Sequence, residues 1–367
     1  MVTTLPPGRE SARVGMNFNH DRLRRRGLVW AWGLLLTLSA ACGGSNSVGP
    51  TETPVATAPT GEALPADSAA LVDSTLLGIP TDSAAAITPS ALAAGTQPGI
   101  VFGSANMDPQ YLTSVHTGTF KGGGITPLNV LSFLAAARAK NARVVLKLCM
   151  GSDSYVKNPD GTFSLTKWKA LVARFQTVNL GPYIADGTLI GHYLIDEPSM
   201  TTRWGGKIIS HTTLEAMAQY SKQLWPEMTT FVRAAPSWLA QTTITYKYVD
   251  AGWLQYASNK GDVTKLVAAE VAAGKRKGLG LMVGLNALDG GNGSSRIRGP
   301  TAGKYSMSAS ELRSYGAALL NQPYACGFYV YSYAFTGPTY YARTDIKAAM
   351  AELSSKARSH VRTSCRQ

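Results

Sequence analysis

The chain has 367 residues, 45% hydrophobic and 16% charged, so it is long enough for one large domain or two ordinary ones. Its 37 glycines and 19 prolines do not form a collagen-like repeat, but small residues crowd near the N-terminus, which argues against one uniform compact fold. The formal net charge is +13, and a basic excess of this size raises nucleic acid or an anionic surface as a partner.

The positive charge is spread along the chain. Residues 1–41 hold six arginines against two acids, residues 43–98 hold five acids and no Lys or Arg, and residues 99–367 carry the remaining +14. Apart from the run 275–277, the cations of that last part stand singly, without interleaved aromatic residues. We therefore expect a basic solvated surface and no nucleic-acid partner.

Residues 1–41 are typical of a secretory leader. The basic stretch 22–26 precedes about 15 apolar or small residues that end at Cys42, a run too short for a membrane-spanning helix. The segment Leu-Ser-Ala-Ala-Cys-Gly-Gly-Ser, residues 38–45, resembles the bacterial lipobox, which implies that Cys42 is lipidated and becomes the mature N-terminus. The usual leucine three positions earlier is Ser39, so the alternative is an ordinary signal peptide with a chance cysteine.

Residues 42–98 are predicted to form a lipidated, disordered tether. They are rich in Ala, Pro, Ser and Thr, have no aromatic residue and cannot bury enough surface to offset their chain entropy. Gly43, rather than Asp, follows the cysteine, so we expect anchoring in the cell envelope, at the outer membrane if the cell has two membranes. Either Met1 or Met16 can be the start, since residues 1–15 add nothing to a leader.

Three further cysteines permit at most one intramolecular disulfide. We expect Cys326 to pair with Cys365, because this bond would fix the C-terminal tail to the body in an oxidising compartment. Cys149 then remains as a small buried hydrophobic residue.

Residues 99–367 alternate short apolar runs with amphipathic stretches, which predicts a (β/α)8 TIM-type barrel. The eight expected strands are 99–102, 115–118, 143–148, 189–195, 229–233, 251–256, 279–285 and 327–331. The expected helices include 127–140, 165–175, 213–224, 263–277, 308–320 and 345–356.

In such a barrel, chemistry lies just after the C-terminal ends of the strands. The residues at those positions are unusually polar and aromatic: Asn106, Asp108, His116, Lys147, Asp153, Asp196, Glu197, Arg233, Trp238, Tyr256, Asn286, Asp289, Tyr331, Tyr333, Tyr340 and Tyr341.

The sharpest motif is the segment 192–198, His-Tyr-Leu-Ile-Asp-Glu-Pro, where an apolar strand ends in two adjacent carboxylates. It resembles the (β/α)8 glycoside hydrolases, whose fourth strand commonly ends Asn-Glu-Pro with the glutamate as acid/base. The resemblance implies that Glu197 is the general acid, with Asp196 in the Asn position.

The sequence departs from that family at the seventh strand, where the family carries a nucleophilic glutamate and this chain does not. Asp289 is the nearest carboxylate. A second reading is substrate assistance, in which Asp196 steadies the acetamido group of an N-acetylated sugar. A third is a structural role, with the Asp-Glu pair capping the strand end and pairing with Arg233 or Lys147.

Polar and aromatic residues of the same loops suit a sugar ligand, because a ring stacks on the CH face of a pyranose while polar groups bond its hydroxyls. The predicted substrate-binding residues are Lys147, Arg233, Trp204, Trp238, Tyr256, Asn286, Tyr331 and Tyr333. The five histidines have no zinc-site spacing, and the glycines form no nucleotide-binding frame, so no metal and no cofactor are expected.

These observations favour a monomeric, surface-anchored glycoside hydrolase acting on an extracytoplasmic oligo- or polysaccharide. Two alternatives remain. One is a barrel lipoprotein that binds saccharide without cleaving it, and the other is an envelope scaffold.

Overall fold

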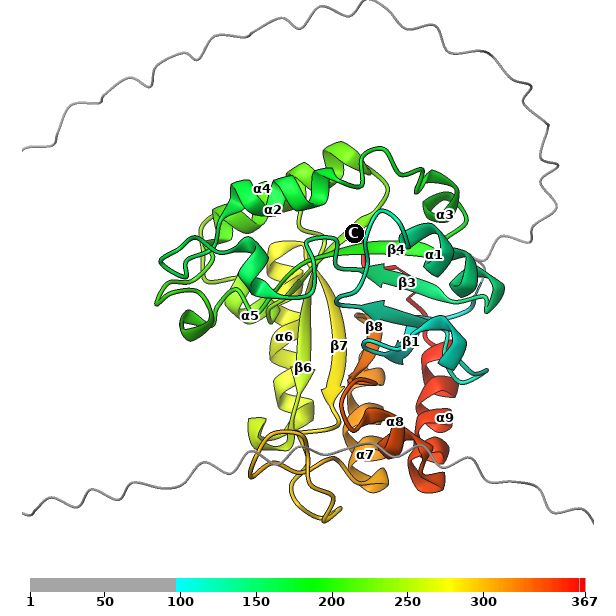
Figure 1. Ribbon diagram of the computed structural model, residues 1–367. Coiled ribbons are helices and arrows are strands. Elements are labelled where there is room, and N and C mark those ends of the chain that lie inside the picture. Colours follow the sequence, from blue (N-terminus) through cyan, green and yellow to red (C-terminus); the bar gives the residue numbers. More distant parts are fainter. Residues whose placement is uncertain (1–96, 363, 367) are drawn as a thin grey trace, which may run out of the picture. The chain divides into compact units, whose positions relative to one another are not determined.

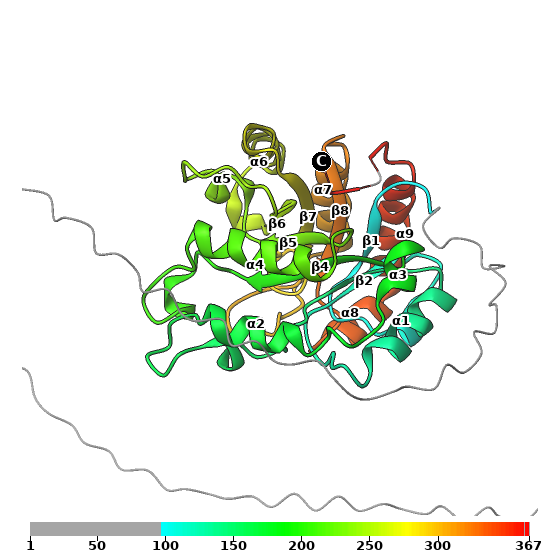
Figure 2. The same cartoon turned by 90° about the horizontal axis from the view of Figure 1, so that it is seen from above.

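A computed structural model describes residues 97–362 and 364–366. The predicted leader, Cys42 and the tether up to residue 96 lie outside the described residues. The described part contains eight parallel strands flanked by helices (Figures 1 and 2). The strands are β1 (Val101–Ser104), β2 (Gly118–Lys121), β3 (Arg143–Leu146), β4 (Leu189–Asp196), β5 (Thr229–Arg233), β6 (Ala251–Tyr256), β7 (Gly280–Asn286) and β8 (Ala325–Tyr331).

The strands follow the order β1-β8-β7-β6-β5-β4-β3-β2, which is that of a barrel opened between β1 and β2. Individual hydrogen bonds bring these two strands together: Thr117 N donates to Phe102 O at 2.9 Å, and Asn106 N to Phe120 O at 2.7 Å. The (β/α)8 fold predicted from the sequence is therefore confirmed as a nearly closed barrel.

The inside of the barrel is filled by side chains. Phe120 packs against Tyr193 and Trp253, with ring centroids 4.5 and 5.5 Å apart, and Val145, Phe231 and Tyr329 belong to the same cluster. Residues of the opposite strand faces pack against the helices. Burial on both faces explains why the strands are apolar runs and do not alternate with polar residues.

The helices are α1 (Val130–Ala139), α2 (Leu165–Ala173), α3 (Gly181–Ala185), α4 (His211–Leu224), α5 (Pro236–Leu239), α6 (Val263–Lys277), α7 (Ala309–Leu320), α8 (Gly337–Ala342) and α9 (Thr344–Arg358). Their ends follow local chemistry. Asp262 caps α6 by accepting from Lys265 N, Gly278 ends it in the left-handed conformation, and Ser308 and Glu311 form a capping box on α7.

The second predicted strand, 115–118, is wrong in its position. The strand is Gly118–Lys121, so His116 precedes it and Lys121 stands at its C-terminal end, where it pairs with Asp108 at 2.6 Å. No apolar run marks this strand, because polar threonines stand at buried positions in and beside it. Their hydroxyls are satisfied by the backbone: Thr117 Oγ1 accepts from Phe102 N, and Thr119 Oγ1 donates to Met107 O.

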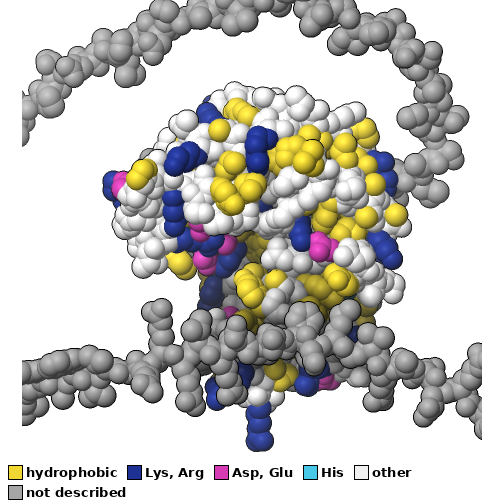
Figure 3. Space-filling model, viewed as in Figure 1, with side chains coloured by type: hydrophobic (Ala, Val, Ile, Leu, Met, Phe, Trp, Pro, Cys, Tyr) yellow, Lys and Arg dark blue, Asp and Glu magenta, His cyan; other side chains and the backbone are white. Residues whose placement is uncertain are grey.

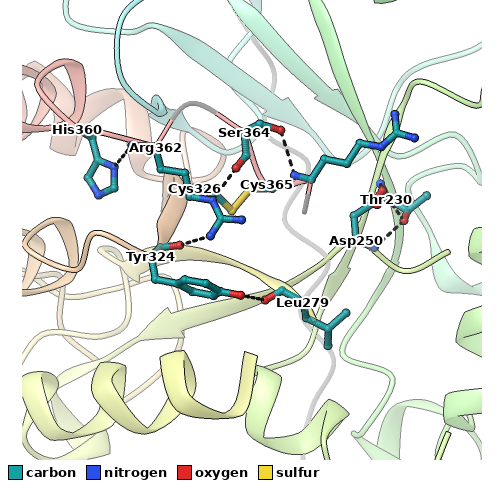
Figure 4. The surroundings of a disulfide bond; sticks show 10 residues. Thr230, Asp250, Leu279, Tyr324, Cys326, His360, Arg362, Ser364 and Cys365 are labelled. Atoms are coloured by element: carbon teal, nitrogen blue, oxygen red, sulfur yellow. Dashed lines mark hydrogen bonds between the residues drawn. A yellow bond between two sulfur atoms is a disulfide. The ribbon is translucent and has the colours of Figure 1, made fainter. Parts of the chain in front are cut away.

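The C-terminal segment is fixed by the disulfide between Cys326 and Cys365, the pair predicted from the sequence (Figure 4). Neighbouring bonds hold the same segment, since Arg362 Nη1 donates to Tyr324 O, and Tyr324 Oη donates to Leu279 O at 2.9 Å. Cys149 is buried and unpaired, as expected. Lysines and arginines lie scattered over the face in Figure 3 and form no continuous stripe.

Candidate active site

Asp196 and Glu197 lie at the C-terminal end of β4. Asp196 is the last strand residue and pairs in register with Arg233, the last residue of β5. Glu197 has a positive φ of 45°, and Trp204 Nε1 donates to its carbonyl oxygen at 2.9 Å. The turn directs both carboxylates into the same group of charged side chains, and each remains partly exposed, by 21% and 27%.

Two arginines clamp this pair. Arg233 donates to Asp196 Oδ1 at 2.9 Å and to Glu197 Oε1 at 2.6 Å. Arg203 donates from Nη1 to Asp196 Oδ2 at 2.6 Å and to Glu197 Oε2 at 2.9 Å. All four carboxylate oxygens therefore accept from an arginine, and Tyr193 Oη adds a bond to Asp196 Oδ1 at 2.7 Å.

The charges set the ionisation of Asp196. Burial raises the pKa of its carboxyl, but the guanidinium groups of Arg233 and Arg203 more than offset this, so the pKa is lowered overall. Burial, followed by the nearby charge of Asp196, raises the pKa of Tyr193 well above its usual value. Asp196 is thus an ionised acceptor and Tyr193 a neutral donor at neutral pH.

A third carboxylate extends the network. Arg203 Nη2 donates to Asp153 Oδ1 at 3.1 Å, and its Nε also bonds this carboxylate. Lys147 Nζ lies 3.7 Å from Asp153 Oδ1 and is almost fully buried. Three cations and three carboxylates therefore alternate across the ends of β3, β4 and β5. We call the six residues the charge network: Lys147, Asp153, Asp196, Glu197, Arg203 and Arg233.

The predicted residues on β7 and β8 lie in a different setting. Asn286 Oδ1 accepts from Asp289 N at 3.3 Å, and the carboxylate of Asp289 accepts from Thr301 N and Oγ1 at 3.0 and 2.8 Å. Asp289 is thus bonded within its own loop.

Tyr331, the last residue of β8, is affected by charges from both β4 and the loop after β7. Burial raises the pKa of its hydroxyl, the charge of Arg233 lowers it, and the charges of Asp196 and Asp289 raise it further.

The predicted aromatic platforms divide into two groups. Trp204 and Tyr256 are buried: Trp204 packs edge-on against Phe163, and Tyr256 donates to Gly261 O at 2.5 Å, so neither ring is open to a ligand in this structure. Trp238 is half-buried and stacks on His211 at 4.3 Å.

Tyr333 lies between two other tyrosines, with ring centroids 5.3 Å from Tyr111 and 6.0 Å from Tyr341. Tyr111 is 50% exposed, and Phe335, on the loop after β8, is 70% exposed. The exposed aromatic surface therefore includes two residues that the sequence analysis missed.

Sequence reasoning also missed Arg203 and Tyr193. Arg203 lies on a short 3-10 helix, Thr201–Arg203, six residues after Glu197, and this closeness to the carboxylates was the one available signal. Tyr193 faces the inside of the barrel from within an apolar strand, where nothing in the sequence separates it from a packing residue.

Within residues 97–362 and 364–366, no three His, Cys, Asp or Glu side chains are grouped as metal ligands. No helix in this part of the chain is long and apolar enough to cross a membrane.

No protein-family model matches the chain, and no curated protein matches its sequence. Solved structures share its fold. An endo-1,4-β-mannanase from Rhizomucor miehei aligns with a TM-score of 0.50 and 10% identity, covering 71% of this chain and 95% of that one.

A native xylanase from Cellvibrio japonicus aligns at a TM-score of 0.42 and 14% identity, over 77% of this chain and 76% of its own. A β-D-glucuronidase from Dictyoglomus thermophilum gives 0.42 and 10%, and the match covers 65% of this chain and 44% of the longer enzyme. The alignment with the mannanase, at a TM-score of 0.50, shows that this (β/α)8 fold is also found in a glycoside hydrolase.

Proposed function

We propose that the protein is a glycoside hydrolase and that its substrate binds over the charge network. The observation that carries the proposal is the pair of adjacent, partly exposed carboxylates, Asp196 and Glu197, at the C-terminal end of β4. This is the barrel end where enzymes of this fold place their catalytic groups. The fold of the mannanase supports the proposal by analogy.

The arginine clamp sets a condition on the mechanism. Glu197 can act as a general acid only if its carboxyl faces the glycosidic oxygen, and both of its oxygens now accept from Arg203 and Arg233. Substrate binding must therefore displace at least one of these bonds, so that Glu197 turns to the leaving oxygen. Asp196 remains ionised and can steady positive charge that develops at the sugar ring.

A barrel that binds saccharide without cleaving it is the second candidate. The same arginine pairs favour it, because they hold both carboxylates as ionic partners of the protein itself. Asp289, the remaining candidate nucleophile, is also engaged, by Thr301. In this function Arg233 and Tyr331 would bond hydroxyl groups, and the exposed Tyr111 and Phe335 would stack on sugar rings.

Turnover and binding on a panel of unactivated β-glycans separate the two candidates. For a hydrolase, Glu197→Gln should lower the rate at least about a hundredfold and leave saccharide affinity nearly unchanged. Glu352→Gln, at an exposed side chain of α9 that pairs with Arg313, is the matched control and should keep the parent rate.

Two further variants distinguish the mechanisms. Substrate assistance predicts that Asp196→Asn is as severe as Glu197→Gln, whereas a nucleophile at Asp289 predicts that Asp289→Asn is the severe change. If the parent protein binds saccharide but does not cleave it, the proposed hydrolase activity would be ruled out and the saccharide-binding function supported.

We further propose that Cys42 carries a lipid and that the barrel works outside the cytoplasm, tethered to the cell envelope as a monomer. The basis is the leader, the lipobox-like segment and the composition of residues 42–98. The disulfide between Cys326 and Cys365 is in keeping with an oxidising compartment.

A further inference from the structure

A cavity of about 550 Å³ lies at the N-terminal end of the barrel, the end opposite Asp196 and Glu197. The starts of five strands line it, through Val101, Arg143, Leu189, Ile190, Thr229 and Cys326. The segments 97–98 and 364–366 complete the wall, and the Cys326–Cys365 disulfide holds the second of them in place (Figure 4). Its volume is in the range of small-molecule sites.

Arg143 is the unusual residue of this cavity. Its side chain is 95% buried, and its Nη1 donates to Gly99 O at 3.1 Å. Its Nε and Nη2 are buried and have no hydrogen-bond partner among the described residues, so a ligand in the cavity reaches them only if the guanidinium turns toward it. Glu227 is the acid that lines the same cavity, and it pairs with Arg366 at 3.1 Å.

A buried guanidinium without a counter-ion is costly, because burial removes the water that stabilises its charge. Burial accordingly lowers the pKa of Arg143. Nε and Nη2 are adjacent donors on one edge of the planar group, and their spacing matches the two oxygens of a carboxylate. The two unpartnered donors of Arg143 are thus of the kind that binds a carboxylate at two points.

The remaining wall is mostly apolar and includes Val101, Leu189, Ile190, Phe231 and the disulfide. We propose that this cavity binds a small carboxylate with an apolar body, whose carboxylate pairs with Nε and Nη2 of Arg143. The apolar body lies against the strand starts, so a bare inorganic anion gains less from the site. This site is separate from the proposed glycan site and does not depend on it.

The test uses the full chain and benzoate as the probe, with benzamide as its neutral match and inorganic phosphate as a bare anion, all at equal ionic strength. Benzoate should raise the midpoint of thermal unfolding by several degrees, and benzamide and phosphate should raise it much less. Calorimetric titration gives the affinity. Equal effects of the three probes, or no effect of benzoate, would overturn the proposal.

Arg143→Met keeps the length of the side chain and removes its charge, so benzoate affinity should fall at least tenfold. Ile190→Trp fills the cavity while Arg143 stays, and it should weaken binding as strongly even if Arg143→Met fails to fold. Arg313→Met, which removes an exposed arginine paired with Glu352, is the control and should bind as the parent does. Undiminished binding by Ile190→Trp would place benzoate elsewhere and refute the site.

Discussion

At the scale of single residues, the candidate site is organised by arginines more than by its carboxylates. Arg203 bonds Asp153, Asp196 and Glu197 at once, and Arg233 bonds two of these three. Removing either arginine leaves partly buried carboxylates close to one another with less compensating charge. The arginines therefore fix the carboxylate positions, and any substrate must compete with them.

Arg203→Met should lower the free energy of unfolding by about 2 kcal/mol at pH 7, since it breaks a partly buried network. The matched change Arg313→Met breaks an exposed pair and should cost less than about 1 kcal/mol. Urea unfolding of both variants measures the difference. Equal losses would mean that the network adds no more than a surface ion pair.

His192 gives a prediction about pH. It is fully buried, its Nδ1 lies 2.8 Å from Ser221 Oγ, and its ring stacks on Trp168. Burial lowers its pKa from 6.5 to about 3. Below about pH 6.5 the unfolded chain binds a proton at this residue and the folded chain does not, so stability falls as the pH is lowered from 6.5 toward 3.

The contribution of His192 should be about 1.4 kcal/mol per pH unit between pH 6 and 4. His192→Gln should remove this part of the slope, whereas His211→Gln, at the half-buried histidine on Trp238, should keep it. Urea unfolding at four pH values gives the slopes. Parallel slopes for His192→Gln and the parent protein would contradict a neutral buried His192.

At the scale of elements, the sequence predicted seven of the eight strands within two residues of their observed ends. Thr229–Arg233 and Ala251–Tyr256 have the predicted bounds, and so does the helix Val263–Lys277. The strand Gly118–Lys121 was misplaced because Phe120 is its one large apolar residue. The short helices α3, α5 and α8 were missed because four to six residues are too few to show a helical period.

Positions at or shortly after strand ends predicted five of the six residues of the charge network. Lys147, Asp153, Asp196, Glu197 and Arg233 were found this way, and the structure brings all five together. Arg203 comes from a loop whose path no periodicity specifies. The burial of Trp204 could not be read from sequence either, because an indole suits a core and a sugar platform equally.

The disulfide acts on a whole segment. It joins residues 39 positions apart and holds the tail against the start of β7, where Cys365 O lies close to Gly280. A closed loop of this length restricts the unfolded chain by about 4 kcal/mol in the chain-entropy model. The paired variant Cys326→Ala/Cys365→Ala should therefore unfold at distinctly lower urea concentration than the oxidised parent. Identical midpoints would show that the bond adds no stability.

At the scale of the whole molecule, residues 97 and 98 contact the barrel just before the predicted boundary at 99. Gln97 bonds the carbonyl of Asn141, and Pro98 lines the cavity at the base of the barrel. A chain shortened to residues 97–367 should therefore unfold within a few degrees of one spanning 43–367, because residues 43–96 lack aromatic residues and apolar periodicity. A larger drop in the melting temperature would mean that this segment packs on the barrel.

Membrane attachment should depend on Cys42. The apolar run before Cys42 is too short to span a bilayer, so we expect the lipid to be the anchor. In a bacterial host that processes lipoproteins, the protein should sediment with membranes, and intact mass should show diacylglycerol on Cys42. Cys42→Ala should abolish the modification, so its intact mass should show no diacylglycerol. Ser45→Ala, three residues further on, is the control and should be lipidated and sediment like the parent. A parent protein that is cleaved elsewhere and is soluble would show that the leader is an ordinary signal peptide. Lipid found on Cys42→Ala would show that Cys42 is not the modified residue.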